Sequence, residues 1–146
     1  RFKESQIRAM GRGASGVKAI RLKSGDEVAG FDIIRTSEEL SAKSNKQFLV
    51  VMEKGFAKQT PLKEYKLQNR GGSGIKTARI TPKTGPIVGS RVIGEETEIF
   101  ALSAKGQVIR TELKSVRQTG RSAQGVKIMN LKLGDRLAGV VIILLK

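Results

Sequence analysis

The feature that most constrains the fold of this chain is an internal repeat of about 50 residues. When Gly55 is aligned with Gly106, an offset of 51 (106 − 55), the two segments correspond over much of the repeat. The start of the chain joins the same register at an offset of 109 (116 − 7), which places Ile7 on Val116. Self-similarity at this period is typical of architectures in which each repeat packs against its neighbours.

Each repeat consists of short strand-like runs separated by turns, and no stretch sustains a helical period. Apolar runs at Phe48–Met52 and Ile99–Leu102 predict strands buried on both faces, and Lys-Gly turns at 54–55 and 105–106 predict hairpins. Alternating runs predict half-buried strands at Val17–Leu22, Ile75–Thr81, Val108–Thr111 and Val126–Leu131, and closing strands at Val28–Ile34 and Leu137–Leu144.

Four short strands in about 50 residues are the signature of a propeller blade. We therefore predict an all-β fold, a partial β-propeller of about three four-stranded blades. The blades are expected at residues 1–35 (partial), 47–95 and 97–146, in one repeat domain fragment, with 36–46 as a polar inserted loop that we expect to be mobile. Because Arg1 already falls within a repeat, we expect the chain to be a piece of a longer protein.

Three copies of one pattern, Arg-x-x-x-Gly-[Val/Ile]-Lys, mark the same place in each repeat: Arg12–Lys18, Arg70–Lys76 and Arg121–Lys127. Small residues between the two cations let a backbone approach closely, and Arg and Lys supply charge. This favours a rim of phosphate-binding loops. The alternative is that each glycine fills a left-handed turn position while the cations are merely solvated.

The net charge supports the phosphate interpretation independently. Lys and Arg number 28 against 13 acidic residues, a formal charge of +15. The excess follows the repeats: residues 31–52 are balanced, and 92–101 carry only Glu95, Glu96 and Glu98. A basic surface that repeats along the chain predicts contact with nucleic acid.

Other classes of function find little support. The chain has no Cys and no His, which removes disulfides and His-based catalysis, and we find no catalytic, cofactor or metal site. Gly11–Gly16 matches the dinucleotide fingerprint, but a strand and not a helix is expected after it. Tyr65 aligns with Ile7 and Val116, so we expect it in the core. Leu137–Leu145 is far below the roughly 18 residues of a membrane span, and a cytoplasmic setting is the simplest expectation.

Phe48–Gly74 resembles a blade of the C-terminal domain of the A subunit of bacterial DNA gyrase. Arg8–Asp26 (RAMGRGASGVKAIRLKSGD) and Gln107–Asp135 resemble neighbouring, later blades of that domain. The related subunit of topoisomerase IV shares the blade, so both subunits remain open as relatives.

The resemblance implies a six-bladed disc, or β-pinwheel, whose basic rim bends and wraps double-stranded DNA in the ATP-dependent negative supercoiling reaction. It implies a DNA-binding part without a catalytic site, working with the remaining gyrase A domains and with the gyrase B subunit, which would use the ATP and Mg²⁺. The gyrase A box reads QRRGGKG and Gln68–Gly74 reads QNRGGSG, so Asn69 and Ser73 replace two cations. Gln68–Gly74 is either the box itself or a box-like loop of a later blade. The DNA-binding residues expected from the pattern and the resemblance are Arg12, Lys18, Gln68, Arg70, Gly71, Gly72, Gly74, Lys76, Arg121 and Lys127.

Two other functions stay open at this point. One is a propeller that docks proteins, although such repeats usually carry Trp and this chain has none. The other is a small basic RNA-binding or ribosomal protein, in which irregular basic tails would be expected. Sequence-tolerant binding of duplex DNA agrees best with a charge that follows the repeat.

Overall fold

The computed structural model describes residues 1–34 and 45–144, and within them the regular structure is almost entirely β. The strands are β1 (Gln47–Met52), β2 (Phe56–Pro61), β3 (Ile87–Ile93), β4 (Glu98–Ser103), β5 (Val108–Glu112), β6 (Val126–Lys127) and β7 (Leu137–Ile143). Three single 3₁₀ turns accompany them in the described residues: η1 (Glu4–Gln6), η2 (Leu62–Glu64) and η3 (Leu113–Ser115). The predicted all-β class is confirmed.

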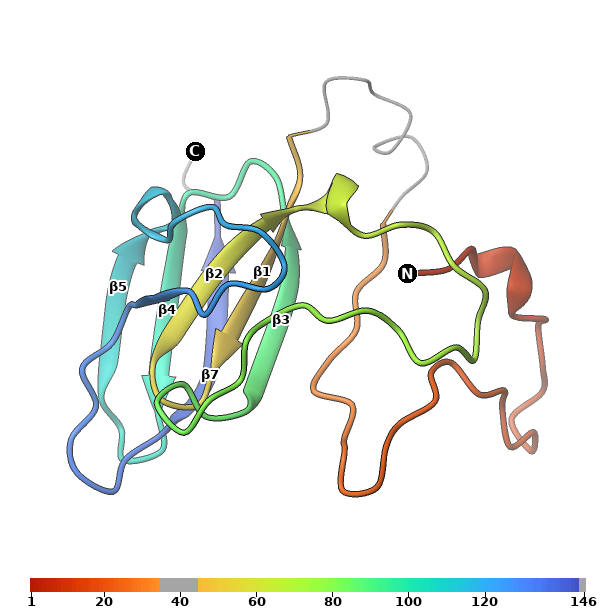
Figure 1. Cartoon of the computed structure of the whole chain (residues 1–146), viewed down its shortest axis with the longest axis horizontal. Coiled ribbons are helices and arrows are strands. Elements are labelled where there is room, and N and C mark those ends of the chain that lie inside the picture. Colours follow the sequence, from red (N-terminus) through yellow and green to blue (C-terminus); the bar gives the residue numbers. More distant parts are fainter. Residues whose placement is uncertain (35–44, 145–146) are drawn as a thin grey trace.

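Two antiparallel sheets, with strand orders β3-β1-β2-β6 and β5-β4-β7, pack against each other, and their strands overlap in the view of Figure 1. They are copies of one unit, because Phe48 pairs with Thr60 in the first sheet and Ile99 with Thr111 in the second, at the expected offset of 51. The first sheet has a fourth strand because β6, which comes from the next repeat, pairs with β2 at Phe56 and Ala57. Successive repeats therefore share backbone hydrogen bonds as well as packing.

Strand β1 is buried on both faces, as its continuous apolar run predicts. Leu49 and Val51 pack with Ile99 and Ala101 of β4 in a core that joins the two sheets. Val50 and Met52 face the other way, into a smaller cluster with Phe56 and Ala78. The hairpins predicted at 54–55 and 105–106 are also confirmed, with Gly55 and Gly106 at φ +78° and +84°.

Several strand predictions in the irregular parts are wrong. Val17–Leu22, Val28–Ile34 and Ile75–Thr81 form no strand, and Val126–Leu131 is a strand at its first two residues only. Alternation of polar and apolar residues indicates which side chains face solvent. A strand also needs a neighbouring strand with which it forms a series of backbone hydrogen bonds. Residues 17–22 are held instead by isolated bonds, such as Arg21 N–H to Gly72 O at 2.8 Å. The insertion expected at 36–46 falls almost wholly outside the described residues.

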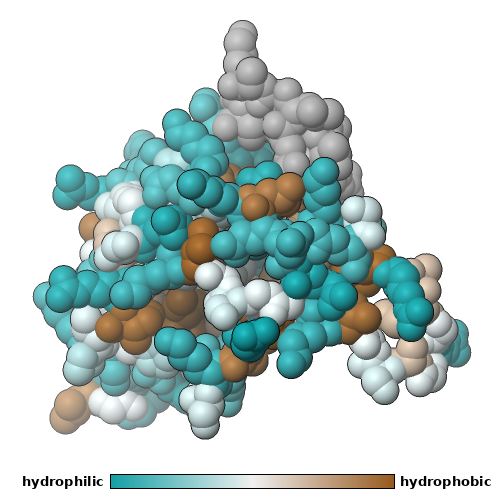
Figure 2. All heavy atoms as spheres, turned by 45° about the vertical axis from the view of Figure 1, so that its right-hand side comes forward, coloured by the Kyte–Doolittle hydropathy of each residue, from teal (hydrophilic) through white to brown (hydrophobic). Residues whose placement is uncertain are grey.

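The N-terminal segment lies next to the first sheet, and the chain after β2 extends alongside it (Figure 1). The face of the molecule shown in Figure 2 is mostly hydrophilic, with scattered apolar patches. Tyr65, predicted to be a core residue, is 8% exposed, packs edge-on against Phe48, and shares a 2.6 Å hydrogen bond with Thr77 Oγ1. The part of the chain that is described has no helix long and apolar enough to cross a membrane.

Candidate nucleic-acid interface

The three basic loops present their lysines in the same way. The side chains of Lys18, Lys76 and Lys127 are all exposed, and each follows a Gly-[Val/Ile] pair. The preceding glycines, Gly16, Gly74 and Gly125, have φ between +72° and +90°, a conformation that residues with a Cβ rarely adopt. The turn that presents each lysine is therefore specified by the glycine two residues before it.

The arginines of the second and third loops have a different environment from the lysines. Arg70 is half-buried, and its guanidinium donates from Nε to Gln6 O (3.1 Å) and from Nη1 to Lys18 O (2.6 Å). Its backbone N–H donates to Gln6 Oε1 at 2.6 Å. Beside it, Gly71 N–H donates to Ala19 O at 2.8 Å. The second loop is thus fastened to the first by the arginine that the pattern predicts to bind phosphate.

The third loop repeats this arrangement. Arg121 is half-buried, donates from Nη1 to Lys76 O (3.2 Å), and its backbone N–H donates to Glu64 Oε2 (3.3 Å). Glu64 and Gln6 hold equivalent positions in their repeats, 58 residues apart (64 − 6). In both loops the arginine therefore reaches the main chain of the lysine that belongs to the preceding copy.

Most of the remaining predicted residues lie in the second loop or next to it. Gln68 is exposed and its N–H donates to Arg1 O at 3.0 Å, while Gly72 O accepts from Arg21. Gly71 and Gly74 have φ of +78° and +72°. Arg12 is exposed in the first loop, whose glycine-rich match to a dinucleotide fingerprint forms an exposed turn with no helix after it. The structure thus brings Arg70 and Lys18, and Arg121 and Lys76, into contact.

A buried lysine supports the third loop from inside the first sheet. Lys58, on β2, is 0% exposed, and its Nζ donates to Thr77 O (2.8 Å), Gly120 O (2.6 Å) and Arg121 O (2.9 Å), with Ala123 O at 3.5 Å. Burial lowers the pKa of Lys58 to about 8, the charge of Glu64 opposes this, and Arg121 adds to it. The ammonium form still predominates at neutral pH, where it has three hydrogens for these carbonyls.

Sequence reasoning missed Lys58 because a lysine in a strand usually marks the solvent face. Its repeat partner at an offset of 51 is Ile109, an apolar residue, and this is the signal that could have placed Lys58 inside. It also missed Lys83, in the turn that precedes β3. The ammonium groups of Lys83 and Lys127 lie 5.8 and 5.9 Å from the ring centroid of Phe56. Lys83 therefore adds a cation beside the third loop.

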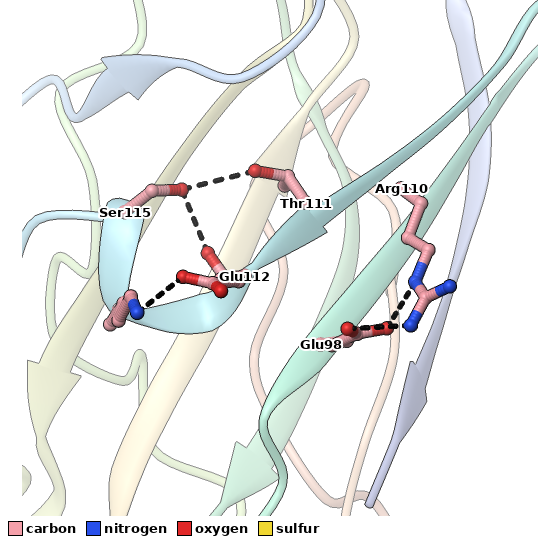
Figure 3. Close-up of polar contacts among 6 residues, drawn as sticks. Glu98, Arg110, Thr111, Glu112 and Ser115 are labelled. Atoms are coloured by element: carbon pink, nitrogen blue, oxygen red, sulfur yellow. Dashed lines mark hydrogen bonds and ion pairs between the residues drawn. The ribbon is translucent and has the colours of Figure 1, made fainter. Parts of the chain in front are cut away.

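Other charged groups on the second sheet are already paired (Figure 3). Arg110 Nη2 donates to Glu98 Oε1 at 2.8 Å, and this bond holds the pKa of Glu98 below its usual value. Lys114 lies 2.7 Å from Glu112, whose carbonyl accepts from the Ser115 hydroxyl. These cations contribute less to an anion site than the exposed lysines of the loops. Within residues 1–34 and 45–144, no three acidic side chains gather as a metal ion would require.

The sequence and the two propeller-like sheets match one family of known proteins. A family model described as "DNA gyrase C-terminal domain, beta-propeller" matches residues 1–35, 49–93 and 97–143. The chain belongs to this family. The A subunit of DNA gyrase from Staphylococcus epidermidis is 44% identical over 135 residues, and that of Staphylococcus aureus is 43% identical, each match covering 92% of the chain.

Solved structures agree with this membership in the gyrase C-terminal domain family. The chain is similar to a DNA gyrase A C-terminal domain at a TM-score of 0.78 and 27% identity, over 95% of this chain and 45% of that one. It shares the fold of a topoisomerase IV C-terminal domain at a TM-score of 0.84 and 22% identity, over 97% and 42%. The chain spans 14% of the length of the curated gyrase subunits and less than half of either solved domain.

A pair of glycine substitutions tests how the loops of this gyrase-family domain are held. A Cβ added at Gly125 would lie 2.5 Å from Ala57 O, whereas one at Gly16 would meet nothing within 4 Å. Both positions have positive φ, so Gly16→Ala should cost about 1 kcal/mol and Gly125→Ala at least about 1 kcal/mol more. Urea unfolding measures both, and equal costs would contradict the close approach of the third loop to β2.

Proposed function

We propose that this domain binds duplex DNA without regard to sequence and bends and wraps it, as part of a type IIA DNA topoisomerase of the gyrase kind. The observation that carries this proposal is the placement of Lys18, Lys76 and Lys127 at equivalent exposed positions on three successive, linked loops. Charges that recur with the repeat fit a polyanion whose charges also recur.

Wrapping requires that contacts offset the cost of bending. Bending 20–30 base pairs through 40–90° costs on the order of 1–6 kcal/mol. Each further loop along a curved rim adds phosphate contacts, which release counterions and so contribute to binding. Because these contacts are made by lysine ammonium groups and glycine-rich backbone, with Arg12 and Gln68 beside them, they position the duplex and do not read its bases.

In this proposal the domain is a DNA-binding module that holds no catalytic residues of its own. The remaining gyrase A domains, together with the gyrase B subunit, supply cleavage and ATP turnover, with Mg²⁺, in the cytoplasm. Gln68–Gly74 acts as a box-like loop of a later blade: with Asn69 and Ser73 where the box has cations, it contributes to wrapping through Lys76 and its backbone.

The experiment that tests this function relaxes closed circular DNA with a nicking-closing enzyme in the presence of the protein. Wrapping should leave a linking-number change that grows with the amount of protein bound. Duplexes of unrelated sequence should compete equally for binding. A strong preference for one sequence, or binding to single-stranded RNA in preference to duplex DNA, would overturn the proposal.

A further inference from the structure

We propose that Arg70 and Arg121 act as struts, side chains that fix the spacing between one DNA-binding lysine and the next. These two arginines determine how far the duplex bends, and not how many phosphates are bound. This rests on the proposed function, since it assigns the lysines to phosphate and gives the arginines of the same loops a separate role.

The first support is where the guanidinium groups bind. Arg70 Nη1 donates to Lys18 O and Arg121 Nη1 donates to Lys76 O, at 2.6 and 3.2 Å. In each case the acceptor is the main chain of the exposed lysine one copy earlier. The position of that lysine is therefore coupled directly to the position of the next loop.

The second support is that the surrounding bonds repeat as well. The strut backbone N–H donates to the side chain at the end of the preceding 3₁₀ turn, Gln6 for Arg70 and Glu64 for Arg121. Arg21 N–H donates to Gly72 O and Arg79 N–H to Ala123 O, at 2.8 and 3.2 Å, again at equivalent positions. These shared bonds join the first loop to the second and the second loop to the third in a similar way. A wrapped DNA duplex needs contacts that are regularly spaced in this manner.

The third support is the contrast in burial within one loop. The struts are half-buried, whereas the lysines six residues later are exposed. A planar guanidinium can bond two carbonyls at once, and Arg70 does so with Gln6 O and Lys18 O. A lysine at either place carries the same charge but lacks the planar guanidinium. Arg70→Lys therefore loses this two-carbonyl arrangement, and Arg121→Lys loses the Nη1 bond to Lys76 O, without removing the charge.

The test uses that separation in the intact protein. Arg70→Lys with Arg121→Lys is compared with Lys63→Arg with Lys114→Arg, which also preserves charge and lies at exposed positions of η2 and η3, just before the second and third loops. Two quantities are measured for each: the slope of log affinity against log salt on linear duplex, and the linking-number change per bound protein on relaxed circles. Far-UV circular dichroism checks that each variant is folded.

We expect the salt slope of the strut variants to change by less than the roughly 0.9 that one phosphate contact contributes. The linking-number change should fall at least twofold. The control variant with Lys63→Arg and Lys114→Arg should keep both. Gln6→Leu, which removes a bond to Arg70 N–H without altering charge or any phosphate-binding residue, should lower the linking-number change in the same direction with an unchanged slope.

Strut variants that wrap like the wild type, or that lose slope as phosphate contacts would, overturn the inference while leaving the proposed function intact. A wild type that binds duplex DNA with a steep slope but leaves no linking-number change contradicts wrapping itself, and the struts with it. If the double Arg→Lys variant does not fold, Gln6→Leu alone decides: unchanged wrapping by that variant also overturns the inference.

Discussion

Replacing Lys76 and Lys127 together by Ala should weaken duplex DNA binding about 60-fold at 0.1 M salt. Each lost phosphate contact lowers the magnitude of the log–log salt slope by roughly 0.9, so two contacts remove about 1.8. Both ammonium groups are exposed on successive loops, and neither supports the sheet by a hydrogen bond that its removal would break within the described residues. Fluorescence anisotropy with a labelled duplex over a salt series measures both the affinity and the slope.

A matched pair of lysines separates specific contacts from general charge. Lys63 and Lys114 are exposed at equivalent positions of two 3₁₀ turns, 51 residues apart (114 − 63). Their replacement by Ala also removes two positive charges, as many as the Lys76 and Lys127 double variant loses. That control should lose much less affinity, because Lys114 is already paired with Glu112. Equal losses in the two double variants would mean that net charge, and not the array of loops, carries the binding.

Lys58→Met should reduce the free energy of unfolding by about 3 kcal/mol. Methionine fills most of the space of the lysine stem but leaves three part-buried carbonyls, Thr77 O, Gly120 O and Arg121 O, without this donor. The third loop should lose its order together with this stability, which hydrogen exchange at Ser122–Gly125 would show. Lys63→Met, at an exposed position, should change stability by no more than about 0.5 kcal/mol.

The pH dependence of the wild type and Lys58→Met gives a second readout. The folded pKa of Lys58 is lowered to about 8 from its ordinary value of 10.5, so between these pH values the unfolded chain binds the proton more tightly than the folded one. Stability contributed through this group therefore rises with pH across that window. The difference in unfolding free energy between wild type and Lys58→Met should widen from pH 8 to 10.5, and a constant difference would contradict a lowered pKa of Lys58 in the folded protein.

The hairpins of the repeat could be predicted from the sequence, because short local patterns of apolar residues and turn residues determine them. Apolar runs at Phe48–Met52 and Ile99–Leu102, each followed by Lys-Gly, fix two hairpins and their register by side-chain burial and turn chemistry. Residues 17–22 and 28–34 also carry several apolar side chains but form no strand. Their backbone partners are set by how repeats meet in space, which alternation along one segment does not report.

The positions of the three basic loops in the repeat could be predicted from the sequence, whereas the different surroundings of their arginines and lysines could not. The pattern of Arg, Gly and Lys, which occurs three times in the sequence, indicates three equivalent loops, and the lysine of each is exposed in the structure. It could not distinguish a guanidinium that faces solvent from one that bonds Lys18 O or Lys76 O, because that depends on the distance between two repeats. Lys58 illustrates the same limit, since four carbonyls from segments 19 to 65 residues away determine its environment.

The most direct test of the account is the salt dependence of wild-type binding to linear duplex DNA. The three exposed lysines alone give a log–log slope of about −3, and all six loop cations give about −5. We predict a slope between these values that is the same for duplexes of unrelated sequence. A slope near zero, or one that differs strongly between sequences, would contradict the claim that a repeated array of basic loops carries the phosphate backbone of bent DNA.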